Sequence, residues 1–301
     1  MAYIYPKFSN NEFLGVRFGG AGLGNLLFTW ANAEIIAKEN NLKVIWPTWK
    51  SIKVGPWIRN EKDKRFYGDL FDNKDGHIGG IKKFKLLRCR KPIHYKNVSS
   101  YNDLEENDVI IYDEYRADFS DLIKYRDYLV KIFKSNLQKK GEKAMAFDAS
   151  NSVNIHVRMG DFANNQTSLD CGQNNTRIPI EWYVWIVKKL RECLGNININ
   201  VFSDGSREEL APLLSLDGVT QVTFGNSIAD IVALSKSPLV ISSGSTFSLW
   251  ARFIGNCNSI SYPKQNKART VSDEGFELEI GMGENFSEEE ILKIKRLYNY
   301  I

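Results

Sequence analysis

Hydrophobic and polar positions alternate most regularly in the second half of the chain. Short apolar runs are followed there by segments whose apolar residues recur at helical spacing. Because a strand, a helix and another strand in succession build a parallel crossover unit, this order predicts a parallel, doubly wound sheet. The predicted strands span 153–157, 197–202, 219–224, 239–241 and 259–262, and the predicted helices 179–194, 207–214, 228–235 and 247–254.

The first half predicts one strand–helix–strand unit. A strand over 13–18 leads into the glycine-rich loop 19–25, which opens a helix over 26–40 with apolar residues at turn spacing. A second strand, over 43–46, is stopped by Pro47. Beyond this unit, the pattern predicts a strand over 108–112, a helix over 121–138 and a final helix from the capping residue Ser287 to about 298.

The length of 301 residues allows two domains of ordinary size. The charged run 139–143 follows a predicted helix and indicates a domain boundary. We therefore predict two Rossmann-like domains, residues 1–145 and residues 146–301, the second of them closed by the C-terminal helix.

Composition narrows the class of protein. The chain is 43% hydrophobic and 25% charged, as soluble globular proteins are, and its net charge of +4 is too small to indicate nucleic-acid binding. Four scattered cysteines and three dispersed histidines indicate neither a disulfide framework nor a metal site. The sequence shows no signal peptide and no apolar run of about 18 residues. We expect a cytoplasmic protein that binds no nucleic acid and no metal.

Residues suited to chemistry follow several predicted strands. In open parallel sheets, ligands bind outside the carboxyl ends of the strands, so we expect these segments to mark a ligand site. They are the glycine loop 19–25 and the segments 158–161, 203–205 and 242–246.

The run from His156 to Asp161 places an imidazole, a guanidinium and a carboxylate directly after a strand. Arg158 can hold a phosphate through two parallel hydrogen bonds and so stabilise charge on a departing nucleoside diphosphate. The structural alternative is an ion pair of Arg158 with Asp161 at a domain seam. Asp161 is interpreted as the partner that orients Arg158 or as a turn cap, and His156 as a donor contact or a buried core residue.

The glycine loop matches neither the dinucleotide fingerprint nor the P-loop. Gly22, Gly24 and Asn25 nevertheless precede or begin a helix, where backbone N–H groups can face an anion or a sugar. The alternative is a tight turn between strand and helix.

Two further segments offer groups for a nucleotide. Ser245 and Thr246 stand at a helix start, where free N–H groups bind phosphate, although both can be ordinary caps. Asp204 follows a strand and can accept from ribose hydroxyls or a base, or cap the next helix.

The run from Lys82 to Lys91 contains six basic residues. Such a run is usually a solvated face. The alternative is attraction to anionic lipid or to an anionic acceptor, and thus peripheral contact with a membrane.

Taken in order, these segments resemble the α-1,2-fucosyltransferase-like glycosyltransferases of family 11 and the wider fucosyltransferase group with a His-x-Arg-Arg-x-Asp motif. The matching segments are 20–28, with Gly-Leu-Gly-Asn; 112–119, an aromatic and polar stretch; 156–161, the central motif; 202–204, Phe-Ser-Asp; and 243–250, with Ser-Thr-Phe-Ser. The chain departs from the family pattern at four positions. They are Met159 for Arg, Gly205 for Asp, Gly244 for Asn and Leu249 for Trp.

The resemblance implies an α/β fold of GT-B type, with two Rossmann-like domains facing a cleft. It implies inverting, metal-independent transfer of fucose from GDP-fucose to a glycan hydroxyl in α-1,2 linkage, in synthesis of a bacterial surface polysaccharide. The N-terminal domain would hold the glycan acceptor, free or lipid-linked, and the C-terminal domain would hold the nucleotide sugar.

The resemblance also implies residue roles. Arg158 would lie on the phosphates and Asp204 on the nucleoside. The residues expected near the pyrophosphate are Ser245, Thr246 and Phe247, with Gly24 and Asn25 approaching from the N-terminal domain. Met159 and Gly205 leave two alternatives open: a transferase that uses another nucleotide sugar, and a non-catalytic nucleotide- or glycan-binding relative.

Overall fold

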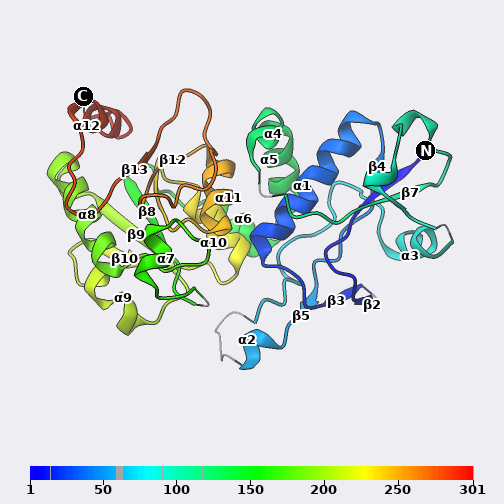
Figure 1. Ribbon diagram of the computed structural model, residues 1–301, viewed down its shortest axis with the longest axis horizontal. Helices are drawn as coiled ribbons and strands as arrows, with labels where there is room; N and C mark the ends of the chain where they lie inside the picture. The colour runs from blue at the N-terminus through cyan, green and yellow to red at the C-terminus, as the bar shows by residue number, and fades with distance from the viewer. Residues whose placement is uncertain (14, 59–63, 90, 117, 161, 301) are drawn as a thin grey trace. The chain divides into compact units, whose positions relative to one another are not determined.

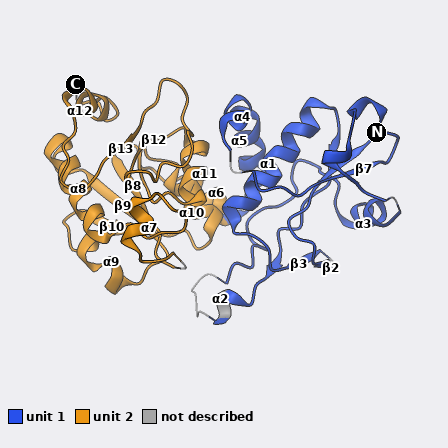
Figure 2. Ribbon diagram, viewed as in Figure 1, with its two compact units in different colours: residues 1–139 blue, residues 140–301 orange. Residues whose placement is uncertain are grey.

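The computed structural model describes residues 1–301 except 14, 59–63, 90, 117, 161 and 301, and it leaves the side chains of 56 and 57 undescribed. The chain divides into two compact units, Met1–Lys139 and Lys140–Ile301 (Figure 2). This division lies before the boundary predicted after residue 145, because all but the first residue of α6 (Lys139–Met145) belongs to the second unit. There the Lys140 ammonium donates to the Gly225 carbonyl over 3.0 Å.

The second unit is built on a six-stranded sheet in the order β10–β9–β8–β11–β12–β13 (Figure 1). Every pairing in it is parallel. Counted from β8, this is the order of the dinucleotide-binding fold, whose chain reverses its winding between the first and fourth strands. The strands are β8 (Ser152–Val157), β9 (Asn198–Ser203), β10 (Val219–Gln221), β11 (Leu239–Ser242), β12 (Asn258–Ser261) and β13 (Glu277–Glu279).

Helices cover both faces of this sheet, and all six residues of β8 are therefore buried. The strands and helices predicted for this half are present, with ends shifted by a few residues. The structure adds α7 and β13, which the hydrophobic pattern did not reveal. The helices are α7 (Gln166–Asp170), α8 (Ile180–Leu194), α9 (Arg207–Leu214), α10 (Ser227–Leu234), α11 (Thr246–Gly255) and α12 (Glu288–Arg296).

The first unit contains a four-stranded parallel sheet in the order β4–β1–β7–β6 and a small sheet in the order β2–β3–β5. Strands of the main sheet are β1 (Tyr3–Pro6), β4 (Lys43–Val44), β6 (Ile93–His94) and β7 (Val109–Tyr112); those of the small sheet are β2 (Glu12–Phe13), β3 (Val16–Phe18) and β5 (Ser51–Ile52). The helices are α1 (Leu23–Glu39), α2 (Gly55–Ile58), α3 (Gly80–Cys89), α4 (Ser120–Lys124) and α5 (Arg126–Ser135), with short 3-10 turns η1 (Tyr95–Asn97) and η2 (Tyr101–Asp103).

The prediction that a strand over 13–18 forms the first crossover unit with the strand at 43–46 was wrong. Instead β1 pairs in parallel with β4, so the crossover runs β1–α1–β4. Strands β2 and β3 form an antiparallel pair in which Phe13 lies opposite Val16. The aromatic residues that suggested a core strand lie outside, since Phe13 is 66% exposed and Phe18 47%. The helix predicted over 121–138 is likewise divided, at Tyr125, into α4 and α5.

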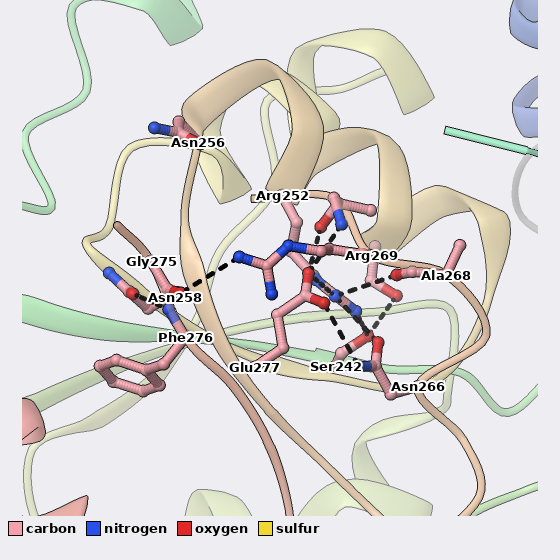
Figure 3. A network of polar contacts seen from close by, with 12 residues as sticks. Ser242, Arg252, Asn256, Asn258, Asn266, Ala268, Arg269, Gly275, Phe276 and Glu277 are labelled. Carbon is pink, nitrogen blue, oxygen red and sulfur yellow. Dashed lines mark hydrogen bonds and ion pairs between the residues drawn. The ribbon is translucent and has the colours of Figure 1, made fainter. Parts of the chain in front are cut away.

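A buried ion pair explains why the polar segment β13 joins the sheet (Figure 3). The Arg252 guanidinium of α11, with no exposed surface, pairs with Glu277 of β13. Glu277 also accepts from the Thr270 backbone N–H and hydroxyl, each over 2.8 Å. Although burial opposes it, the charge of Arg252 and the bonds from Thr270 hold the pKa of Glu277 below its ordinary value.

Arg252→Met is expected to lower the free energy of unfolding by about 3–5 kcal/mol, because it leaves the Glu277 carboxylate buried and uncompensated. Urea denaturation measures this. Arg252→Met with Glu277→Leu should recover most of the loss. Arg269→Ala, which removes a half-exposed guanidinium near Asp273, is the control and should change little. A harmless Arg252→Met would contradict this account.

Candidate functional site

The strand order of the second unit brings the carboxyl ends of β8 and β11 together at the point where the winding reverses. In sheets of this order the ligand lies in the crevice outside those ends. Most of the predicted site residues of this unit gather there or at the neighbouring end of β9. They are His156, Arg158, Asp204, Ser245, Thr246 and Phe247.

Arg158, just after β8, forms an ion pair with Asp204, just after β9. The other oxygen of Asp204 accepts from the Met159 backbone N–H over 2.8 Å. The Phe162 ring lies 5.3 Å from the guanidinium carbon. Because both charged side chains stay partly accessible, at 22% and 32%, the guanidinium is oriented and can still meet an anion.

The partner that the structure describes for Arg158 is therefore Asp204. The sequence predicted Asp161 in that role, and residue 161 lies outside the described residues. A Cβ on Gly160 would collide with the Asp204 carboxylate, so a larger residue there would displace the ion pair.

His156 is buried behind this pair, with 4% of its surface exposed. Its Nδ1 lies 2.7 Å from the Ser243 hydroxyl, and its ring stacks on Phe247 with centroids 4.6 Å apart. Burial, and then the charge of Arg158, lower the pKa of His156 to about 3. The imidazole is thus neutral near pH 7 and joins β8 to the turn after β11.

The turn before α11 leaves the start of this helix without a side-chain cap from the described residues. The Ser245 hydroxyl lies within 3.3 Å of the Ser243 hydroxyl, and within the described part of the chain it makes no cap to the helix. Gly244 has a φ of 73°, and a Cβ there would lie 2.9 Å from the Gln265 carbonyl oxygen. The first turn of α11 therefore presents backbone N–H groups without a side-chain cap, an arrangement that favours anions.

The glycine loop of the first unit is held by two buried cations. The Lys53 ammonium donates to the carbonyls of Gly20 (3.0 Å) and Ala21 (2.5 Å). Arg17 Nη1 donates to the Gly19 carbonyl over 2.8 Å. Since three successive carbonyls are bound in this way, the conformation of the loop before α1 is set from beneath.

The predicted site residues Gly22, Gly24 and Asn25 lie where this loop leads into α1. Gly22 is the N-cap of α1, and its carbonyl accepts from the Asn25 N–H over 3.1 Å. Sequence reasoning missed Arg17 and Lys53. The signal was a charged residue between apolar neighbours, in Val16-Arg17-Phe18 of β3 and in Ile52-Lys53-Val54 at the end of β5.

Comparison with known proteins identifies the family. The sequence profile described as "Glycosyl transferase family 11" matches residues 99–278, more than half of the chain. The chain belongs to glycosyl transferase family 11. It is 24% identical over 253 residues to an alpha-1,2-colitosyltransferase of Escherichia coli, across 78% of this chain and 85% of that protein.

Solved structures of fucosyltransferases share the fold. The NodZ alpha-1,6-fucosyltransferase soaked with GDP-fucose matches with a TM-score of 0.52 at 13% identity, over 87% of this chain and 94% of that one. Fucosyltransferase NodZ from Bradyrhizobium matches with a TM-score of 0.50 at 13% identity, over 84% and 93%. The predicted α/β fold of GT-B type is confirmed, and this family 11 protein is a glycosyltransferase.

Two of the departures from the family pattern touch each other. A Cβ on Gly205 would lie 2.9 Å from Met159 Cγ, and Met159 is buried in the core. Positions 159 and 205, where the family pattern has Arg and Asp, are therefore neighbours in space. This family 11 chain has an apolar side chain and a glycine in place of those two charged residues.

His156→Gln is expected to weaken the loss of stability in acid. The unfolded chain takes up a proton as pH falls through about 6.5, whereas folded His156 does so only near 3, so the folded state loses stability as pH falls between these values. At about pH 5 this amounts to about 2 kcal/mol relative to neutral pH. Urea denaturation at both pH values measures it, and identical losses in the two proteins would contradict the prediction.

Lys53→Met is expected to loosen the glycine loop without unfolding the unit. The variant keeps the length of the side chain and removes the donors to Gly20 and Ala21. Hydrogen exchange should accelerate about tenfold over residues 19–26. Lys50→Met, at an exposed position three residues away, is the control. Unchanged exchange in Lys53→Met would show that the ammonium does not hold the loop.

Proposed function

We propose that this family 11 enzyme transfers fucose from GDP-fucose to a hydroxyl of a glycan, with inversion and without a metal. The supporting observation is the guanidinium of Arg158, oriented by Asp204 beside the uncapped start of α11, at the switch point of a nucleotide-binding sheet. The NodZ alpha-1,6-fucosyltransferase, whose structure was soaked with GDP-fucose, supports the choice of donor.

The chemistry follows from where charge develops. The acceptor oxygen attacks the anomeric carbon on the face opposite the diphosphate, a new C–O bond forms, and the bond to the diphosphate oxygen breaks. The acceptor proton passes to a carboxylate base, for which the sequence offers Asp161, Asp113 and Glu114. The departing GDP gains negative charge, which Arg158 and the N–H groups of Thr246 and Phe247 would stabilise.

Asp204 in this proposal positions Arg158, because its two oxygens are engaged by the guanidinium and by the Met159 N–H. The sequence predicted a contact with the nucleoside instead. Asp204→Asn distinguishes these roles: misplacement of Arg158 lowers kcat, whereas a lost nucleoside contact raises the Kd for GDP.

Arg158→Ala is expected to lower kcat by about 100-fold or more, because the variant loses the charge that faces the leaving group. Release of GDP from GDP-fucose in the presence of an acceptor panel measures it. Arg296→Ala, on the exposed side of α12, is the matched control. Full turnover by Arg158→Ala would remove Arg158 from the mechanism.

A second candidate donor is a colitosyl nucleotide, which is favoured by the name of the Escherichia coli relative and by the paired replacement at Met159 and Gly205. Ligands that bind the folded state raise Tm, so a thermal-shift screen of nucleotide sugars separates the two donors. If the protein turns over no nucleotide sugar, the alternative of a non-catalytic binding relative holds.

Metal independence is part of the proposal. Within the described part of the chain, no three His, Cys, Asp or Glu side chains gather as a metal site would require. Excess EDTA is expected to leave the rate of transfer unchanged, because Arg158 and helix N–H groups take the role of the cation. A rate restored only by Mg²⁺ or Mn²⁺ after EDTA would contradict this.

We propose α-1,2 linkage and a role in bacterial surface polysaccharide synthesis in the cytoplasm, with the acceptor, free or lipid-linked, held by the N-terminal domain. The basic residues from Lys82 to Lys91 would provide peripheral membrane contact, since α3 exposes Lys82, Lys85 and Arg88. Among the described helices, none has the length and apolar character needed to cross a bilayer.

A further inference from the structure

We infer that the outer face of the small sheet β2–β3–β5, with α2, is a docking surface for an anionic lipid bilayer. The outward side chains of this face are not among the groups proposed to bind the donor. It is the surface through which the first unit would rest on a membrane, whichever sugar the enzyme transfers.

The small sheet has the reverse of the usual polarity. Its inward positions carry Arg17 and Ser51, which are 0% and 1% exposed and lie opposite each other in the register. The next residue on each strand points outwards, and there Phe18 lies opposite Ile52. Sheets with one face in water normally place polar side chains on that face.

Other apolar side chains in and near these strands are exposed as well. Six large apolar side chains of this region are at least 46% exposed. Clusters of this kind mark surfaces that bind another apolar partner. They are Phe13 (66%), Phe18 (47%), Ile52 (46%), Val54 (67%), Ile58 (80%) and Phe66 (53%).

The inward polar residues explain why the pattern is reversed. Arg17 and Lys53 hold the carbonyls of the glycine loop, and Glu12 accepts from the Tyr5 hydroxyl over 2.5 Å. Because alternate residues of a strand face opposite sides, residues fixed inwards for these bonds send their neighbours outwards. That geometry does not require the outward residues to be apolar. Their apolar character therefore points to a partner that covers them.

A neighbouring helix indicates which partner. Lys83 of α3 reaches inwards to Glu12 of β2 over 3.3 Å, which places this helix beside the small sheet. The outward side of α3 exposes Ile81 (76%) and Phe84 (40%), and Lys85 and Arg88 lie on the same side at helical spacing. Apolar side chains set among cations are typical of helices that lie in an anionic membrane interface.

Other occupants fit this chemistry less well. A glycan needs several placed polar partners, and the outward strand positions carry Phe and Ile. A symmetric contact with a second copy would bring the same cationic helix close to itself, which like charges oppose. An anionic bilayer satisfies both the apolar face and the cations.

Co-sedimentation with vesicles tests the inference on the full chain, without donor or acceptor. The protein should sediment with phosphatidylcholine vesicles that contain about 30% phosphatidylglycerol and much less with phosphatidylcholine alone. The double variant Phe18→Ser with Ile52→Ser should bind about tenfold or more weakly, since two large apolar side chains no longer enter the interface.

Leu292→Ser, at a 45% exposed apolar position of α12, is the matched control and should bind like the parent protein. Equal Tm values and equal GDP affinity for the three proteins would show that folding and the donor site are intact. Binding to neither vesicle type, or undiminished binding of the double variant, would overturn the inference. So would a dimer in solution that the double variant dissociates, because the face would then be an interface between copies.

Discussion

The ion pair of Arg158 with Asp204 is the interaction on which the candidate donor site depends. It joins the ends of two adjacent parallel strands, β8 and β9, and it orients the guanidinium proposed to meet the diphosphate. The same carboxylate binds the Met159 N–H, so backbone and side chain are fixed together. A glycine at 160 allows this approach. Charge at the end of the sheet is thus set before any ligand binds, as electrostatic preorganisation requires.

Behind this pair, the second unit supports its binding face with buried polar contacts. His156 bonds to Ser243 across the switch point, and Gln265 packs against Gly244 from the other side. Arg252 reaches the Ser242 hydroxyl over 3.5 Å while it pairs with Glu277. The side chains of His156, Gln265 and Arg252 are buried. They fix the turn whose N–H groups would face the proposed ligand, and a neutral imidazole serves this role where an imidazolium would be costly to bury.

In the first unit, one set of short strands serves two purposes. Arg17 of β3 and Lys53, the residue after β5, hold the glycine loop by its carbonyls, and the outward residues of these strands form the apolar face. The inward and outward residues alternate along the same short strands. The residues that position the glycine loop therefore also determine which side chains form the apolar surface. A change of register by one residue would exchange the inward and outward residues.

The sequence alone determined the strand and helix order of the second unit, because buried parallel strands leave apolar runs that alternate with helical periodicity. It also determined that Arg158, Asp204 and Ser245 follow strands, and hence at which edge of the sheet a ligand site is predicted. Only the tertiary structure decided that Arg158 pairs with Asp204, because 45 residues separate the partners along the chain. It also decided that Phe13 and Phe18 face outwards. Residue types indicate how apolar a strand is, but only the elements packed against the strand decide which of its faces is buried.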